Sequence, residues 1–169
     1  MPSPYLAMAW SLLAPPTLRR MQPQHLHALG RDIVTRAIAI VGLAGIALIH
    51  LLDSIGKYGE TRYLFWMYIA LMAGSLAVAG AVLQLRDRRV WLASGGLAAS
   101  AIAGYVLSRT TGLPAAHGDV GNWTEPLGLA SLFVEGAVVA ISGYAYAFAG
   151  RTPAVALEPL TRGALRAAA

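Results

Sequence analysis

The sequence predicts an all-α protein, a four-transmembrane-helix bundle with both termini in the cytoplasm. Of the 169 residues, 57% are hydrophobic and only 12% are charged, and four apolar runs reach the length of a membrane span. A helix needs about 20 apolar residues to cross the hydrocarbon core of a bilayer. Four such runs in so short a chain leave too little polar sequence to cover them in water, which argues against a soluble fold.

The chain is expected to divide into three parts. A cytoplasmic or interfacial segment (1–32) precedes the transmembrane domain (33–150), and a flexible cytoplasmic tail (151–169) follows. The apolar runs place the spans at about 33–54, 63–85, 90–108 and 126–149.

The distribution of basic residues predicts the orientation. Ten Lys and Arg residues lie in the N-terminal segment, in the connection between the second and third spans, and in the tail, against three in the other two loops. By the positive-inside rule, the ten mark the cytoplasmic side. The same bias explains the formal net charge of +5 through membrane topology. Because no basic patch is interleaved with base-stacking aromatic residues, we expect no nucleic-acid partner.

The residue inventory excludes several classes of function. The chain has no cysteine, which excludes disulfide scaffolds, thiolate metal sites and iron–sulfur clusters. His50 is the sole histidine in a predicted span, so a haem held by two histidines is excluded as well. P-loop, G-x-S-x-G and H-E-x-x-H motifs are also absent from the sequence. The sequence therefore favours a protein that is not an enzyme.

Small residues recur on the third span at every fourth position, at Gly96, Ser100, Gly104 and Ser108. In lipid, helices associate through close backbone approach, which small residues allow. We therefore expect this stripe to be a packing groove, and Gly104→Leu to disrupt folding or assembly.

Glu135 is the least expected residue of the four spans. It follows Pro126 by nine residues, which places it about 13 Å along the helix and near mid-membrane. A carboxylate at that depth is costly and usually faces the interior of the bundle. Arg109 and His50 are the candidate partners. Two interpretations remain open, a functional acid and a buried acid that only locks helices together.

Other polar residues are expected to join Glu135 at the extracytoplasmic end. Glu125, or its neighbour Thr124, is also expected to cap the last helix. The predicted cluster consists of His50, Asp53, Glu60, Arg109, Glu125 and Glu135.

A metal site within this region is a further hypothesis. His50 and Asp53 are three residues apart and share one helix face. Zinc or copper accepts nitrogen and oxygen ligands of this kind. The donor set would be His50, Asp53, His117 and Glu135. Interfacial polar residues and salt bridges are the alternative interpretation, and no other cofactor is predicted.

Two stretches carry a resemblance to a known family. They read S-R-T-T-G-L-P over 108–114 and E-P-L-G-L-A-S-L-F-V-E over 125–135. The chain resembles small four-span bacterial membrane proteins, common in actinobacteria, that carry S-R-T-x-G-L-P and E-P-L-G-x-x-S-L-x-x-E. The resemblance covers about residues 38 to 148. It implies the four-span topology and a bacterial inner membrane, and it implies no catalytic or ligand residue.

Three functions remain open at this point. The first is a non-enzymatic accessory or binding subunit, which would dock a membrane-protein partner or a second copy of the chain in the lipid bilayer. The second is a proton or divalent-metal transporter or channel that uses Glu135. The third is an intramembrane enzyme in which Asp53 orients His50 as a base.

Overall fold

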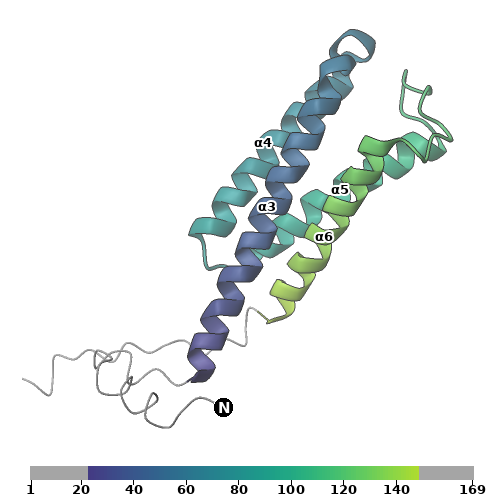
Figure 1. The fold of residues 1–169 in the computed structure, drawn as a ribbon. Helices are drawn as coiled ribbons and strands as arrows, with labels where there is room; N and C mark the ends of the chain where they lie inside the picture. Colours follow the sequence, from purple (N-terminus) through teal and green to yellow (C-terminus); the bar gives the residue numbers. More distant parts are fainter. Residues whose placement is uncertain (1–22, 149–169) are drawn as a thin grey trace, which may run out of the picture.

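A computed structural model describes residues 23–148 of the chain, and within them it contains four helices (Figure 1). They are α3 (Pro23–Glu60), α4 (Arg62–Gln84), α5 (Arg89–Thr110) and α6 (Pro126–Phe148). Each helix is long and apolar enough to cross a membrane. The predicted all-α class with four spans is confirmed. α3 begins and α6 ends at the same end of the bundle.

The first helix is longer than its predicted span. α3 begins at Pro23, ten residues before the expected start at 33. Proline is well suited to the first turn of a helix because its missing N–H has no partner there. The helix therefore includes the last part of the expected N-terminal segment. Residues 1–22 of that segment and the expected tail over 151–169 lie outside the described residues.

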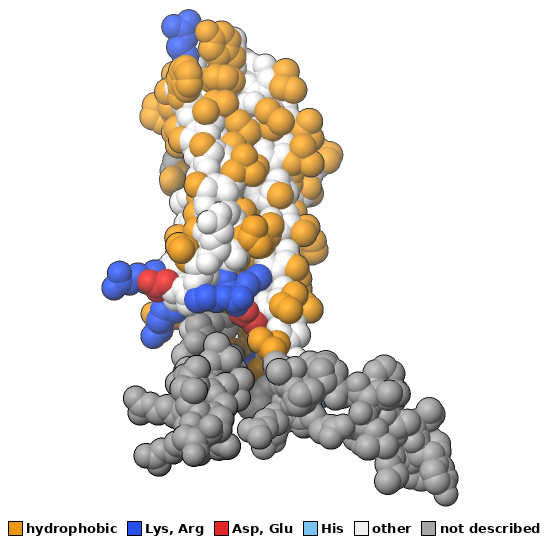
Figure 2. Space-filling model, turned by 90° about the vertical axis from the view of Figure 1, so that its left-hand side faces the viewer, with side chains coloured by type: hydrophobic (Ala, Val, Ile, Leu, Met, Phe, Trp, Pro, Cys, Tyr) orange, Lys and Arg blue, Asp and Glu red, His pale blue; other side chains and the backbone are white. Residues whose placement is uncertain are grey.

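The bundle buries many small side chains and exposes many large apolar ones. Its buried residues include Ala39, Ser75, Ala79, Ser94, Ala98, Ser142 and Ala145. Large apolar side chains such as Val41, Ile55 and Phe133 point outward and are more than 70% exposed. Figure 2 shows such side chains spread along the length of one face. This distribution is typical of a membrane bundle, where lipid covers the outside and small residues let helices approach.

Glycines bring α3 close to α6. A Cβ atom placed on Gly42 would overlap Val138 of α6, and one on Gly45 would lie 3.2 Å from Val134. On the neighbouring side of the bundle, Ser142 of α6 donates a buried hydrogen bond of 2.9 Å to Ser94 of α5. These contacts join α6 to α3 and to α5.

Charged side chains gather at the end of the bundle where α3 begins. Arg36 forms an ion pair of 3.1 Å with Asp32, and Arg86 pairs with the same carboxylate. Arg36 also donates hydrogen bonds to the backbone carbonyls of Val82 and Leu85. These carbonyls lie at the C-terminal end of α4, where a helix provides no backbone partners of its own. Figure 2 shows basic and acidic side chains together at this end.

The small-residue stripe of the third span does not form the expected packing groove between the described helices. No described atom of another helix lies within 4 Å of a Cβ placed on Gly96 or Gly104. Ser100, Gly104 and Ser108 line a cavity instead. The side of α5 that packs on α6 carries Ser94 and Gly95, whose added Cβ would lie 3.3 Å from Ser142. Because Gly104 borders empty space, its replacement by Leu is no longer expected to disrupt the fold.

Candidate functional site

The cavity lies between the α3–α4 hairpin and the α5–α6 hairpin, which spread apart toward the end opposite the start of α3 (Figure 1). Its volume is about 690 Å³, and all four helices and the loop before α6 contribute to its lining. Pockets for small molecules measure about 300–1,000 Å³. The cavity is therefore large enough for a small organic ligand.

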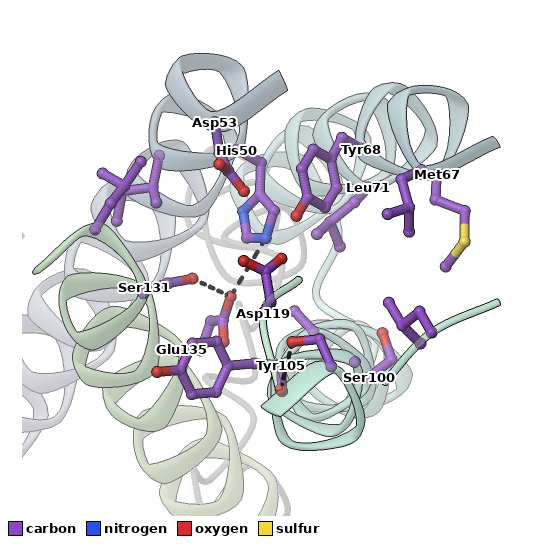
Figure 3. Close-up of a pocket in the computed structure, with 18 of the residues that line it drawn as sticks. His50, Asp53, Met67, Tyr68, Leu71, Ser100, Tyr105, Asp119, Ser131 and Glu135 are labelled. Carbon is purple, nitrogen blue, oxygen red and sulfur yellow. Dashed lines mark hydrogen bonds and ion pairs between the residues drawn. The ribbon is translucent and has the colours of Figure 1, made fainter. Parts of the chain in front are cut away.

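The lining has an apolar side and a polar side. The apolar lining residues include Met67 and Leu71 of α4 and Leu97 and Ala101 of α5. The polar lining residues carry most of the chemistry-bearing groups. They are His50, Asp53, Tyr68, Tyr105, Arg109, Asp119, Glu125, Ser131 and Glu135, and all but Arg109 and Glu125 are labelled in Figure 3.

Glu135 lies at the cavity wall with 1% of its surface exposed. Ser131, one turn earlier on α6, donates a hydrogen bond of 2.6 Å to its Oε1 atom. His50 Nε2 lies 3.7 Å from the same oxygen (Figure 3). The second oxygen, Oε2, has no hydrogen-bond partner among the described residues. A buried carboxyl oxygen without a partner costs free energy, so it is a site where a ligand would be stabilised.

The imidazole of His50 is held in place from two sides. Its Nδ1 atom lies 2.9 Å from the Ile46 carbonyl, and the ring meets Tyr68 edge-on at 5.2 Å. A carbonyl only accepts, so Nδ1 carries the proton in this contact. Nε2 then faces Glu135. One proton shared by the two groups makes this contact favourable, whether it resides on Nε2 or on the carboxyl group.

Asp53 does not orient His50, which corrects the expected pairing for an enzyme. The orienting contact of His50 goes to the carbonyl of Ile46 on its own helix. Asp53 lines the cavity beside Tyr68 and interacts with that tyrosine. The geometry of a base oriented by a carboxylate is therefore not formed by these two residues.

Of the two candidate partners for Glu135, His50 is adjacent and Arg109 bonds elsewhere. Arg109 is 7% exposed and pairs with Asp119 at 2.9 Å and with Glu125 at 3.0 Å. Glu125 Oε2 also accepts the backbone N–H of Gly128 at 3.1 Å, which makes Glu125 the cap of α6. Arg109 thus ties the end of α5 to the loop and to the start of α6.

The loop over 111–125 borders the cavity and is held by backbone geometry. Gly112 and Gly121 adopt φ values of 76° and 79°, which side-chain-bearing residues rarely adopt. The Gly121 N–H donates to the Arg109 carbonyl at 2.9 Å. From α4, the Tyr63 hydroxyl donates to the Pro114 carbonyl at 2.6 Å. The loop is thereby connected to both hairpins.

The expected metal ligands do not come together. His117 lies against Gly112 and is not part of the cavity lining that contains His50, Asp53 and Glu135. Across residues 23–148, where side chains are described, no group of three or more His, Asp or Glu residues is arranged to hold a metal ion. The side chain of Glu60, also expected in the polar cluster, lies outside the described residues.

The sequence pattern missed the two tyrosines of the lining. Tyr68 and Tyr105 both border the cavity beside its charged groups. Aromatic residues near helix ends are commonly assigned to the membrane interface, which conceals a tyrosine that faces inward. Tyr68 lies directly across from His50, one helix away, so only the packing of α3 on α4 relates them.

Comparisons with protein-family models, with curated proteins and with solved structures found no match for this chain.

Proposed function

We propose that this chain is a non-enzymatic binding protein of the membrane that holds a small amphipathic molecule between its two helical hairpins. One observation carries the proposal: a cavity of about 690 Å³ whose wall includes Glu135, a buried carboxyl group with one oxygen, Oε2, unpartnered among the described residues. The charge bias and the resemblance support a bacterial inner membrane, with the cavity in the extracytoplasmic half.

The shape and chemistry of the lining support an amphipathic ligand. An apolar portion fits against the apolar residues of the lining, such as Met67 and Leu71 of α4 and Leu97 of α5. A polar group at the opposite side meets Glu135, whose Oε2 atom gains the hydrogen bond that it lacks. A helix lock alone would explain the burial of Glu135, but it would not explain the empty space beside it.

The packing beyond Glu135 favours binding over an open channel. Leu43, Val82 and Val138 are each at most 1% exposed and fill the bundle on that side. Tightly packed apolar side chains exclude water and ions. A continuous pore through a single described chain is therefore not supported by this arrangement.

Photolabelling with a neutral amphiphile tests the proposal. The chain, reconstituted in phosphatidylcholine nanodiscs, is irradiated with a diazirine derivative of decanol, and labelled peptides are identified by mass spectrometry. We expect saturable labelling at the α4 and α5 residues of the lining, such as Met67 and Leu97. Labelling that is non-saturable and equal at lipid-facing positions such as Phe133 would contradict the proposal.

Two glycines of α5 offer a matched pair of variants. Gly104→Leu places an isobutyl group in the cavity, whereas Gly96→Leu makes the same change on the same helix outside the lining. We expect the first variant to lose saturable labelling and the second to keep it. Equal labelling of both variants would show that the probe does not enter the cavity.

The contact between His50 and Glu135 favours a second candidate, a proton-coupled transporter of the bound molecule. The two side chains come from α3 and α6, so movement of a proton between them is linked to the packing of these helices. If the chain transports its ligand with protons, Glu135→Gln abolishes proton flux into liposomes loaded with a pH-sensitive dye. Equal flux for the parent and the variant would remove this candidate.

A further inference from the structure

We propose that the molecule bound in the cavity is a lipophilic cation. This inference rests on the proposed binding function and names the chemical class of its ligand. The cationic group is placed against Glu135, and the apolar groups lie between α4 and α5.

The charges of the lining favour a cation. It contains four carboxylic acids against one guanidinium and one imidazole, and these groups are Asp53, Asp119, Glu125, Glu135, Arg109 and His50. Whichever member of the His50–Glu135 pair holds their proton, the lining carries two more negative charges than positive ones. In the low-dielectric interior of a membrane bundle, an uncompensated negative field attracts cations strongly.

The guanidinium of Arg109 offers little to an anionic ligand. Its two terminal nitrogens pair with Asp119 and Glu125, so two carboxylates already surround its single charge. The Nε atom of Arg109 has no partner among the described residues. An anion that approached Nε would meet the negative charge of both neighbouring carboxylates, whereas a neutral acceptor or a water molecule would not.

Glu135 supplies the specific contact for the cation. Its Oε1 atom is occupied by Ser131 and faces His50, whereas Oε2 is unpartnered and buried. Tyr68 extends this end of the lining toward Asp53, and the face of a tyrosine ring attracts cations. The cation is therefore expected to lie beside the carboxyl groups of Asp53, Asp119 and Glu135, which Figure 3 shows around His50.

Competition between two ions of matched shape tests this inference. Tetraphenylphosphonium and tetraphenylborate share their size and apolar surface and differ in charge. Each is titrated against the decanol photolabel in phosphatidylcholine nanodiscs, with correction for partitioning into empty nanodiscs. We expect the cation to displace the label at about tenfold lower concentration than the anion, because the excess negative charge of the lining attracts one ion and repels the other.

Variants locate the origin of the preference. Asp53→Asn removes one negative charge from the lining, and Glu135→Gln removes the carboxyl group against which the cation is placed, so the cation-to-anion preference of each variant should fall toward one. Asp87→Asn removes a carboxylate from the connection between α4 and α5, outside the lining, and should keep the parent preference. Because the preference is a ratio within each variant, it is independent of how much folded protein each preparation contains.

The outcomes separate this inference from the function on which it rests. If the label is saturable but the two ions compete equally, or if the anion competes better, the binding function stands and the cationic class is wrong. The cationic class is also wrong if neither Glu135→Gln nor Asp53→Asn changes the preference. If the label never saturates in the parent chain, both proposals fail.

Discussion

At the scale of single residues, Glu135 concentrates the unusual chemistry of this protein. The carboxyl group is buried in a helix long enough to span a membrane, and it contacts a serine on its own helix and a histidine on another. An acid in this position is stabilised by its neighbours or by a ligand. Serine and histidine contact Oε1, whereas Oε2 has no hydrogen-bond partner within residues 23–148.

A double-mutant cycle measures the contact between His50 and Glu135. The two groups lie 3.7 Å apart in a buried setting, so the loss of either group removes the same interaction. We expect His50→Ala and Glu135→Gln to be coupled by about 1 kcal/mol in the free energy of unfolding, measured by denaturant titration in detergent. Additive effects of the two substitutions would show that the pair is not in contact.

The residues of the site could be predicted only in part from the sequence. An acid amid apolar residues identified Glu135, and the spacing of Pro126 from it gave its depth. The choice between His50 and Arg109 as its partner could not be made, because it depends on the packing of α3 on α6. Arg109 also had closer partners in Asp119 and Glu125, which the loop geometry brings to it.

At the scale of the helices, glycines distinguish close contacts from empty space. Gly42 allows α3 to approach α6, whereas Gly104 on α5 faces the cavity. Both glycines lie in apolar helices with small residues nearby, so their sequence surroundings look alike. Periodicity identified the small-residue stripe of α5, but it could not tell which side of the helix meets a neighbour.

Alanine substitution at two glycines tests the helix contacts. The added Cβ of Gly42→Ala would overlap Val138, which forces the helices apart and is expected to cost about 1–3 kcal/mol of stability. Gly80→Ala is the control, since no described atom of another helix lies within 4 Å of its added Cβ. Thermal unfolding in detergent should show a lower midpoint for the first variant only. Equal midpoints would contradict the close packing of α3 on α6.

At the scale of the whole molecule, the fold is a helical bundle with apolar side chains on its outer surface, and its two hairpins spread apart at one end. The apolar runs predicted the four helices because their length and composition reflect the bilayer directly. The cavity could not be predicted in this way. It arises because glycines and serines bring α6 close to α3 and to α5, while the two hairpins spread apart toward the other end (Figure 1), and hydropathy carries no information on that spreading.

The orientation of the chain is a prediction that labelling can test. The sequence has no cysteine, so single cysteines placed at Asp87 and at Asn122 report the two ends of the bundle without background. If the basic end faces the cytoplasm, a membrane-impermeant maleimide added to intact cells labels the cysteine at 122 and not the one at 87. The reverse pattern would place the cavity in the cytoplasmic half.

A density map of the chain purified from its native membrane, with no ligand added, is the most direct measurement of all. We predict density in the space between α4 and α5 that reaches hydrogen-bonding distance of Glu135 Oε2. A map in which Met67 and Leu71 pack directly against Leu97 and Ala101, with no space left between them, would contradict a binding site in this bundle.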